Sequence, residues 1–397
     1  MRRNSTLDLL RAIAVIVIIF HHLYLPDQNT LAAIPGKAYN VFISFINIWH
    51  TGGWIAVDMF FVLSGFLVSG LLFNEYKKYK HIDVKSFIAR RGFKIYPAFV
   101  FFIVSTFIFE LVVSKAMHKQ APSIIESLKD LAFLHNYLAG RWIHTWSLDI
   151  EEFFYLTIPF FLFVLIKYGK LKLSSLFSTY LVLVLLGLTC RWININHAVK
   201  YDFNEQFIKT HFRLDGLFLG VVISYIYNFK PNLLNTLYKY KILALLISTS
   251  ILVLNFVFER ESNLWISVVM LAVNPPAFAV LITLALKFLP DTGNKWLLKI
   301  GQCSYSIYLW HLFFNYYYTL IYLKAINQEG LAQHQQIVYI VYVTANVLSS
   351  LGFGILMTRL IENPSLKWRD KYYPPRVRNI ITNVNQTPEI INLSLTA

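Results

Sequence analysis

Residues 7–22 read LDLLRAIAVIVIIFHH, and this stretch decides the class of fold. Between Arg11 and His22 nearly every residue is Ile, Val, Ala or Phe, as in a membrane-spanning helix. Eleven steps of about 100° return to within about 20° of the starting direction, so both residues share one helix face, about 16 Å apart. Ionisable residues at that depth usually mark a functional path. The alternative is an Arg that snorkels near one end and a His at the interface.

Composition extends this interpretation to the whole chain. Of 397 residues, 56% are hydrophobic and only 14% are charged, which indicates an all-α, polytopic membrane protein. The segment 264–288 contains Asn274-Pro275-Pro276 and is predicted to kink or break there. About ten transmembrane helices are predicted, at 9–25, 54–73, 96–113, 152–168, 175–191, 213–228, 241–258, 264–288, 303–323 and 336–358.

The distribution of charge predicts the topology. The net charge is +15, and the segments assigned to the cytoplasm hold more than twice as many Lys and Arg as the opposite loops. This positive-inside bias predicts cytoplasmic termini, a cytoplasmic loop 74–95 and an outer loop 114–151. The basic excess therefore reflects membrane orientation, and no nucleic-acid partner is expected. We predict a multi-pass protein of the plasma (inner) membrane.

The domain organisation is predicted to be simple. Residues 1–365 form one membrane-embedded domain, and residues 366–397 form a polar cytoplasmic tail. Cys190 and Cys303 are isolated, so no metal site is predicted. Asp8 and Arg11 interrupt the first apolar run, which favours an uncleaved signal anchor over a cleaved signal peptide.

Asp58 is the first candidate partner for His22. It lies about one turn into the second span, at a depth similar to that of His22. An acid beside a His can fix its tautomer and support it as a base. The alternative is a buried polar pair that only holds two helices together. The small residues at 64, 65, 69 and 70 are more simply explained by close helix packing.

A basic cluster precedes the third span. Arg90, Arg91 and Lys94 stand just before Pro97, which can begin a helix. Cations of this kind suit phosphate or pyrophosphate oxygens. The alternative is a stop-transfer cluster that contacts anionic lipid.

Further ionisable residues stand at the ends of later spans. Glu151 and Glu152 adjoin the run that enters the membrane after the outer loop, so at least one of them is expected to point inward. Arg213 and Asp215 stand at the outer end of span six, and His311 lies inside span nine. A lone intramembrane His is more often a packing residue than a base, but several ionisable groups together favour function.

These motifs resemble the acyltransferase 3 family of integral-membrane acyltransferases, which O-acylate sugars and other acceptors, chiefly in bacteria. They occur in family order and cover about residues 5–365. They are Leu7–Arg11 with ten residues to His22, Val57–Phe66, Arg90–Pro97, His144–Tyr155, Arg213–Gly216, Ser304–His311 and Glu362–Pro364.

The resemblance implies a ten-helix fold that takes acyl groups, commonly acetyl from acetyl-CoA, at the cytoplasmic side and delivers them to an outer hydroxyl. It implies that Arg11 and His22 are essential and that Arg91 and Lys94 form the family's basic pair. The family usually has Arg at the second place, whereas Lys94 is a point charge. Some members carry a C-terminal hydrolase-like domain, and we expect none here.

The resulting hypothesis is a bacterial membrane O-acetyltransferase. Acyl-CoA is the expected donor, held through its diphosphate by the basic cluster, and the acceptor is a cell-surface glycan or its lipid-linked precursor. Membrane lipid is the other expected partner, and no metal is needed. A transporter or flippase of lipid-linked glycan, and a non-catalytic organiser of glycan assembly, are the alternatives.

Each catalytic candidate has an expected role. His22 is expected to act as the general base, or to carry the acyl group transiently. Asp58, Glu151 or Glu152 is the expected carboxylate partner of His22, and Arg11 is expected to position the donor or a counter charge.

Overall fold

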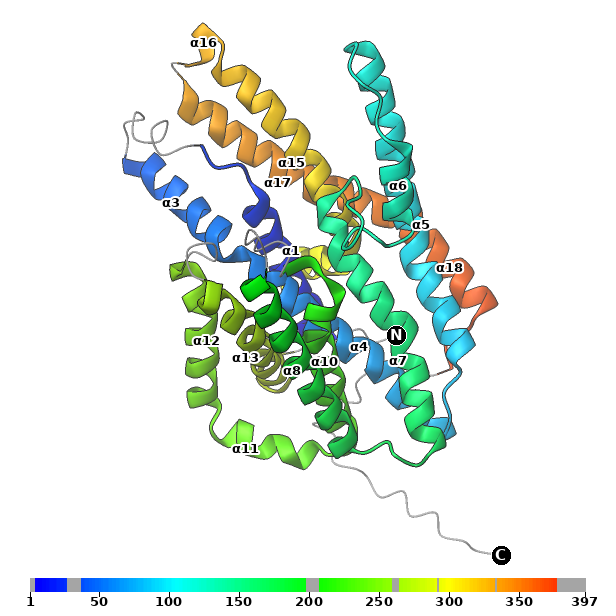
Figure 1. Cartoon of the computed structure of the whole chain (residues 1–397). Helices are drawn as coiled ribbons and strands as arrows, with labels where there is room; N and C mark the ends of the chain where they lie inside the picture. Colours follow the sequence, from blue (N-terminus) through cyan, green and yellow to red (C-terminus); the bar gives the residue numbers. More distant parts are fainter. Residues whose placement is uncertain are drawn as a thin grey trace, which may run out of the picture.

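The computed structural model describes residues 4–26, 37–197, 207–258, 264–290, 293–332 and 334–376. All regular structure in these ranges is helical, which confirms the all-α prediction (Figure 1). The longer helices are α1 (Ser5–His22), α3 (Lys37–Gly52), α4 (Ala56–Tyr79), α5 (Val84–Ala116), α7 (Trp146–Lys167), α8 (Leu173–His197), α10 (Thr210–Phe229), α12 (Lys241–Val257), α13 (Leu264–Phe288), α15 (Ser304–Ile326) and α17 (Gln335–Met357). The shorter ones are α6 (Ile124–Leu131), α11 (Leu234–Lys239), α14 (Lys295–Gln302), α16 (Glu329–Ala332) and α18 (Asn363–Tyr372), with single turns at Gly53–Ile55, Ile143–Thr145 and Pro231–Leu233 and a π-helical turn at Thr358–Glu362.

Within these ranges, six helical segments are long and apolar enough to cross a membrane, or seven if the bent pair at α10 and α11 counts as one span. The protein is therefore a multi-pass membrane protein, but the predicted count of ten is not confirmed. Helices α7 and α15 are among those outside the six, and both carry polar side chains on the faces that line the site described below. Asp149, Glu151 and Glu152 at the start of α7 and the polar face of α15 distinguish these two helices from spans that are apolar throughout.

Apolar side chains on the outside of the bundle agree with a lipid environment. Val112 of α5, Leu185 of α8 and Ile242 of α12 are each more than 60% exposed, alongside many other large apolar residues. Apolar surface on that scale is unfavourable in water and normal in contact with acyl chains.

Helices α4 and α10 pack closely against each other through two glycines. A Cβ placed on Gly65 would lie 1.9 Å from the carbonyl oxygen of Leu217, and one placed on Gly220 would lie 2.4 Å from that of Val62. Only glycine allows the two backbones to come this close, as in small-residue interfaces of membrane helices. The packing interpretation of Gly65 is confirmed.

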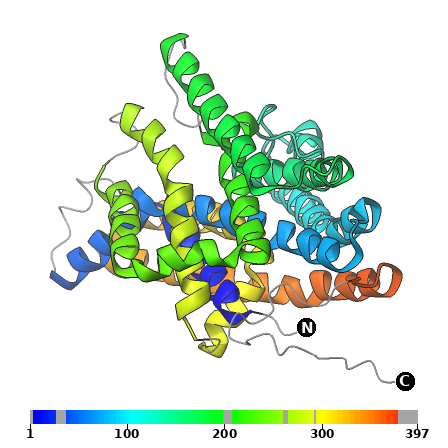
Figure 2. The same cartoon turned by 90° about the horizontal axis from the view of Figure 1, so that it is seen from below.

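The first helix lies against the α14–α15 region, at the centre of the molecule. Figure 2 shows dark-blue α1 beside the yellow α14 segment, in agreement with the contacts between them. Gly301 permits this approach, because a Cβ there would lie 1.7 Å from the carbonyl oxygen of Asp8. Gln302 donates to the Asp8 carboxylate at 3.2 Å. Asn4 is the N-cap of helix α1, and its side chain accepts a hydrogen bond from the Leu7 N–H.

The structure corrects two expectations about proline. Helix α13 continues through Pro275 and Pro276, so the alternative of a break is wrong and that of a kink stays a prediction; neighbouring helices can satisfy the freed backbone groups of a membrane helix. Pro97 does not begin a helix, because α5 already starts at Val84 with Asp83 as its N-cap. The basic cluster therefore lies on a helix and not in a loop.

Candidate functional site

A polar cavity opens between the helices that carry the predicted site residues. Its lining encloses about 820 Å³ of atom-free space, including its open mouth. Helices α1, α4, α5, α7 and α15 all contribute side chains, so the cavity joins segments from the whole length of the chain. The polar residues that line it are Arg11, Ser64, Arg91, Lys94, Ser147, Glu151, Glu152, Tyr155, Ser304, Tyr305 and Tyr308.

The basic cluster divides between two environments. Arg91 and Lys94 line the cavity, and the Arg91 guanidinium lies 5.1 Å from the centre of the Tyr155 ring. Arg90 instead binds the C-terminal segment, through the carbonyl oxygen of Tyr373 and the carboxylate of Asp370 at 3.2 Å. Lys94 comes three positions after Arg91, which places both on one face of α5 and turns Arg90 away. The structure thus brings two of the three predicted phosphate ligands into the cavity.

Glu151 and Glu152 also line the cavity, and both are already hydrogen-bonded. Ser64 donates to Oε1 of Glu151 at 3.1 Å, and Tyr155 donates to Oε2 at 2.6 Å. Tyr96 donates to Glu152. These hydrogen bonds join the two acids to the cavity wall rather than to His22. The two acids lie near Arg91. The geometry does not support the predicted role of either acid as the carboxylate partner of His22.

A polar seam runs from the cavity along the contact between α1 and α15. Its α15 side consists of Ser304, Tyr308, His311 and Asn315, whose spacing of four, three and four places them on one helix face. At the cavity, Arg11 Nε donates to Ser304 Oγ at 3.1 Å. The shared face of Arg11 and His22 predicted from the sequence is the α1 side of this seam.

At the other end of the seam, α15 holds His22 at two points. His311 Nε2 lies 3.4 Å from His22 Nδ1, and Asn315 donates to the His22 carbonyl oxygen at 2.6 Å. His22 Nδ1 also lies 2.9 Å from the carbonyl oxygen of Ile18. A carbonyl can only accept, so Nδ1 carries the proton and Nε2 of neutral His22 carries the lone pair. His22 therefore presents a basic nitrogen at the end of the seam.

Asp58 has a different partner from the predicted one. Its carboxylate forms an ion pair with Arg213 of α10 and accepts from Asn274 of α13 at 3.3 Å. Asp58 and Arg213 are each 1% exposed. Asn274 is also bound to Asn255 of α12. This geometry corrects the expected His22–Asp58 pair and supports the alternative, in which Asp58 holds helices together.

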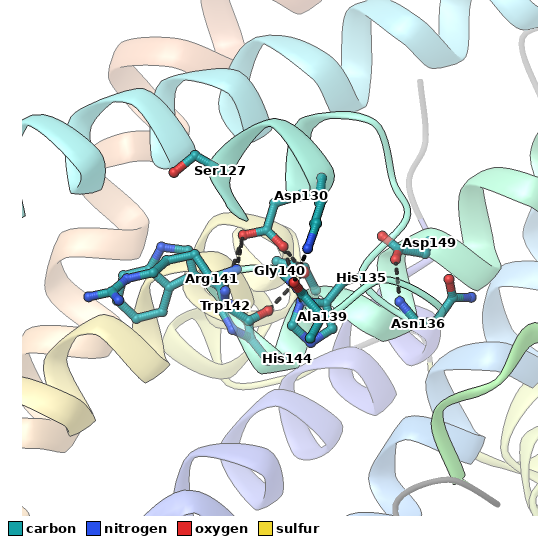
Figure 3. A network of polar contacts seen from close by, with 12 residues as sticks. Ser127, Asp130, His135, Asn136, Ala139, Gly140, Arg141, Trp142, His144 and Asp149 are labelled. Atoms are coloured by element: carbon teal, nitrogen blue, oxygen red, sulfur yellow. Dashed lines mark hydrogen bonds and ion pairs between the residues drawn. The ribbon is translucent and has the colours of Figure 1, made fainter. Parts of the chain in front are cut away.

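The segment between α6 and α7 folds back onto the bundle around one buried acid. Asp130 accepts from the backbone N–H groups of Arg141 at 2.9 Å and Trp142 at 3.1 Å, and it pairs with His135 at 3.1 Å (Figure 3). Trp142 in turn donates to Thr106 of α5 at 3.1 Å. These contacts fix the chain just before His144, and they place the His144 side chain inside the protein.

The sequence of motifs and the geometry of the cavity both call for comparison with known proteins. A sequence model described as the acyltransferase domain matches residues 4–359. The chain belongs to this acyltransferase family. The O-acetyltransferase OatA of Staphylococcus aureus strain NCTC 8325 is 28% identical over 380 residues, which cover 87% of this chain and 57% of the relative.

A second relative of the acyltransferase-family chain comes from Staphylococcus aureus strain MRSA252. It carries a provisional O-acetyltransferase name and is 28% identical over 423 residues, which cover 96% of this chain and 61% of the relative. The chain thus spans about three fifths of the length of these curated relatives. No solved structure matches it.

Sequence reasoning did not assign roles to several residues that the acyltransferase-family fold brings to this site. Ser304, Tyr308 and His144 were present in the matched motifs but received no function. The Tyr308 hydroxyl donates to the His144 carbonyl oxygen at 2.8 Å and lies 2.6 Å from Ser147 Oγ. The polar residues of 304–315 recur at i, i+4, i+7 and i+11, a spacing that indicates one polar helix face in an apolar segment. That spacing was the signal by which the sequence could have assigned these residues to the site.

Proposed function

We propose that this protein is a bacterial inner-membrane O-acyltransferase, with ten membrane spans and cytoplasmic termini. It moves an acyl group, commonly acetyl, from acyl-CoA to a hydroxyl of a cell-surface glycan or its lipid-linked precursor. The observation that carries the proposal is the row of polar side chains on α15 that leads from the cation-lined cavity, where Arg11 binds Ser304, to His311, which contacts His22. Family membership favours an acyltransferase over the transporter hypothesis.

The cavity suits the donor. Arg91 and Lys94 present positive charge toward the cavity from one end of α5, which the charge bias assigns to the cytoplasm. A CoA diphosphate would be held there, by the guanidinium fork of Arg91 and the point charge of Lys94. The pantetheine arm would then extend along the seam past Arg11 toward His22, which is about 16 Å further along α1. No metal is required for this arrangement.

The chemistry assigned to His22 is general-base catalysis. Nε2 takes the proton of the acceptor hydroxyl while that oxygen attacks the thioester carbonyl. When the carbon–sulfur bond breaks, the thiolate leaves and takes the proton back from His22. An acyl group carried transiently on His22 Nε2 is the second route, and it needs the same tautomer.

The function is tested by comparing the acyl content of surface glycans in cells with and without this chain, together with acyl transfer from labelled acetyl-CoA in isolated membranes. We expect both to be lost with the chain. If the protein is a transporter, membranes without it should still transfer acyl groups once they are opened. If it is a non-catalytic organiser, Arg11 and His22 can be replaced without loss of transfer. Either result would reject the proposal.

Arg91→Ala is expected to raise the KM for acyl-CoA and to leave the KM for the acceptor nearly unchanged. Loss of a charge-assisted contact costs about 1.5–3 kcal/mol of binding, or roughly 10- to 150-fold. The measurement is initial-rate kinetics in membranes with matched protein levels.

Arg90→Ala is the comparison for Arg91→Ala, because Arg90 contacts α18 rather than the cavity. It removes the same charge one residue away, and we expect a smaller rise in the donor KM. An unchanged donor KM in Arg91→Ala would leave only the lipid-contact interpretation of the basic cluster.

The proposed topology predicts opposite labelling of two exposed lysine positions. After replacement of Cys190 and Cys303, single cysteines at Lys80 and Lys119 are treated with a membrane-impermeant thiol reagent. Position 119 should react in intact cells, and position 80 only after the membrane is opened, because the charge bias puts residues 74–95 inside. Labelling of position 80 from outside would reverse the topology and remove the donor site from the cytoplasmic face.

A further inference from the structure

Three histidines from distant parts of the chain meet at the outer end of the polar seam. The ring centres of His22 and His311 are 5.0 Å apart, and those of His311 and His144 are 5.2 Å apart. His311 and His144 are 1% and 2% exposed. Arg11, Arg91, Lys94 and the two acids of the cavity lie in the cavity lining and not in this group. Neither His311 nor His144 has a role in the function proposed above.

The backbone contacts determine which ring nitrogen of each histidine carries a proton. His311 Nδ1 lies 2.5 Å from the Tyr308 carbonyl oxygen, so Nδ1 donates and Nε2 carries the lone pair. His144 Nε2 lies 3.0 Å from the Leu309 carbonyl oxygen, so Nε2 donates there. Both carbonyl groups belong to α15. The ring of His311 therefore turns its only acceptor atom toward His22.

The His22–His311 contact is consequently a directed hydrogen bond. The Nδ1–H of His22 is shared between the Ile18 carbonyl oxygen at 2.9 Å and His311 Nε2 at 3.4 Å. Such a bond strengthens when the donor becomes charged, since hydrogen bonds from ionised groups are roughly twice as strong as neutral ones. His311 thus offers little to neutral His22 and more to the imidazolium that forms when Nε2 takes a proton.

We propose that His311 is the positioning residue of His22. It takes the role that a carboxylate usually has beside a histidine that acts as a base. It holds His22 in the Nδ1–H tautomer with Nε2 toward the acceptor, and it stabilises the imidazolium by accepting from Nδ1–H. This inference rests on the proposed function. The proton taken from the acceptor hydroxyl stays on His22 Nε2 until the thiolate leaves, so no additional reactant is needed.

His144 gives this arrangement its rigidity. Its ring meets that of His311 edge to face, at 85°, and its Nε2–H binds the backbone of α15 two residues before His311. Its Nδ1 has no hydrogen-bond partner among the described residues. The His144 ring therefore packs beside His311 while its own hydrogen bond is made to the α15 backbone.

The test compares two replacements of His311 that have similar size. His311→Gln keeps an acceptor that can reach His22 Nδ1–H, and His311→Leu keeps volume without one. In protein that inserts at wild-type levels, we expect His311→Leu to lower kcat roughly 10- to 100-fold, less than the 10²–10⁴-fold typical for loss of a base. The donor KM should not change. His311→Gln should recover much of kcat, which a merely structural role would not predict.

A double-mutant cycle separates this inference from the function on which it rests. In a His22→Ala background, His311→Leu should cause no further loss of residual transfer, because residues that act as one unit are not additive. His211→Leu, which changes an exposed His bound to Tyr137, is expected to keep wild-type kcat. Equal kcat values for the Leu and Gln variants, or additive losses, would overturn the role of His311 while the acyltransferase function stands. Absence of transfer by the wild type would reject the function itself.

Discussion

His22→Ala is expected to abolish acyl transfer while the protein stays in the membrane at normal levels. His22 Nε2 carries the lone pair at the end of the seam, because Nδ1–H donates to Ile18. Loss of a general base typically lowers the rate 10²–10⁴-fold, and loss of an acyl carrier would lower it further. The measurement is acyl transfer per unit of membrane-inserted protein.

His21→Ala is the matched control, because it removes an adjacent imidazole whose hydrogen bond is made to α3. His21 points about 100° away from the His22 face, and its Nδ1–H donates to the carbonyl oxygen of His50 in α3 at 2.6 Å. We expect a far milder effect. Equal defects in the two variants would indicate a packing role for the His pair, and near-normal transfer by His22→Ala would remove His22 from the mechanism.

Asp58→Leu alone is expected to reduce the amount of folded protein strongly. It leaves the Arg213 guanidinium buried without its carboxylate, and breaking a buried pair in this way costs about 3–5 kcal/mol. The measurement is the level and thermal stability of detergent-extracted protein. Asp58→Leu combined with Arg213→Met should recover much of the loss, since apolar residues of similar volume often replace a buried ion pair without penalty.

The activity of the double variant decides between the two interpretations of Asp58. If Asp58 only joins α4 to α10 and α13, the recovered Asp58→Leu/Arg213→Met protein should transfer acyl groups at close to the wild-type rate. A stable but inactive double variant would contradict the structural role and return Asp58 to the chemistry. Asn274, which also binds Asp58, should then be tested by Asn274→Leu.

A helix period was sufficient to predict which residues share a face. Residues eleven apart on one helix share a face whatever they contact, so Arg11 and His22 could be paired from the sequence alone, and both lie on the seam. The resemblance paired Arg91 with Lys94, and the structure places both on one face of α5. Arg90 was grouped with them because adjacent positions look equivalent in sequence, although they differ by about 100° around a helix.

The sequence by itself determined that this protein is an all-α membrane protein and, through its ordered motifs, that it belongs to the acyltransferase family. It did so because apolar length and helical period are local properties of the chain. Only the tertiary structure decided the partners of the polar groups: Arg213 for Asp58, the cavity wall for Glu151 and Glu152, and His311 for His22. Depth in the membrane was predicted for each group, but rotation about the helix axis and the choice of neighbour are set by packing. Close approach at Gly65 and Gly220 brings together α4 and α10, which carry Asp58 and Arg213, and close approach at Gly301 brings α1 against α14.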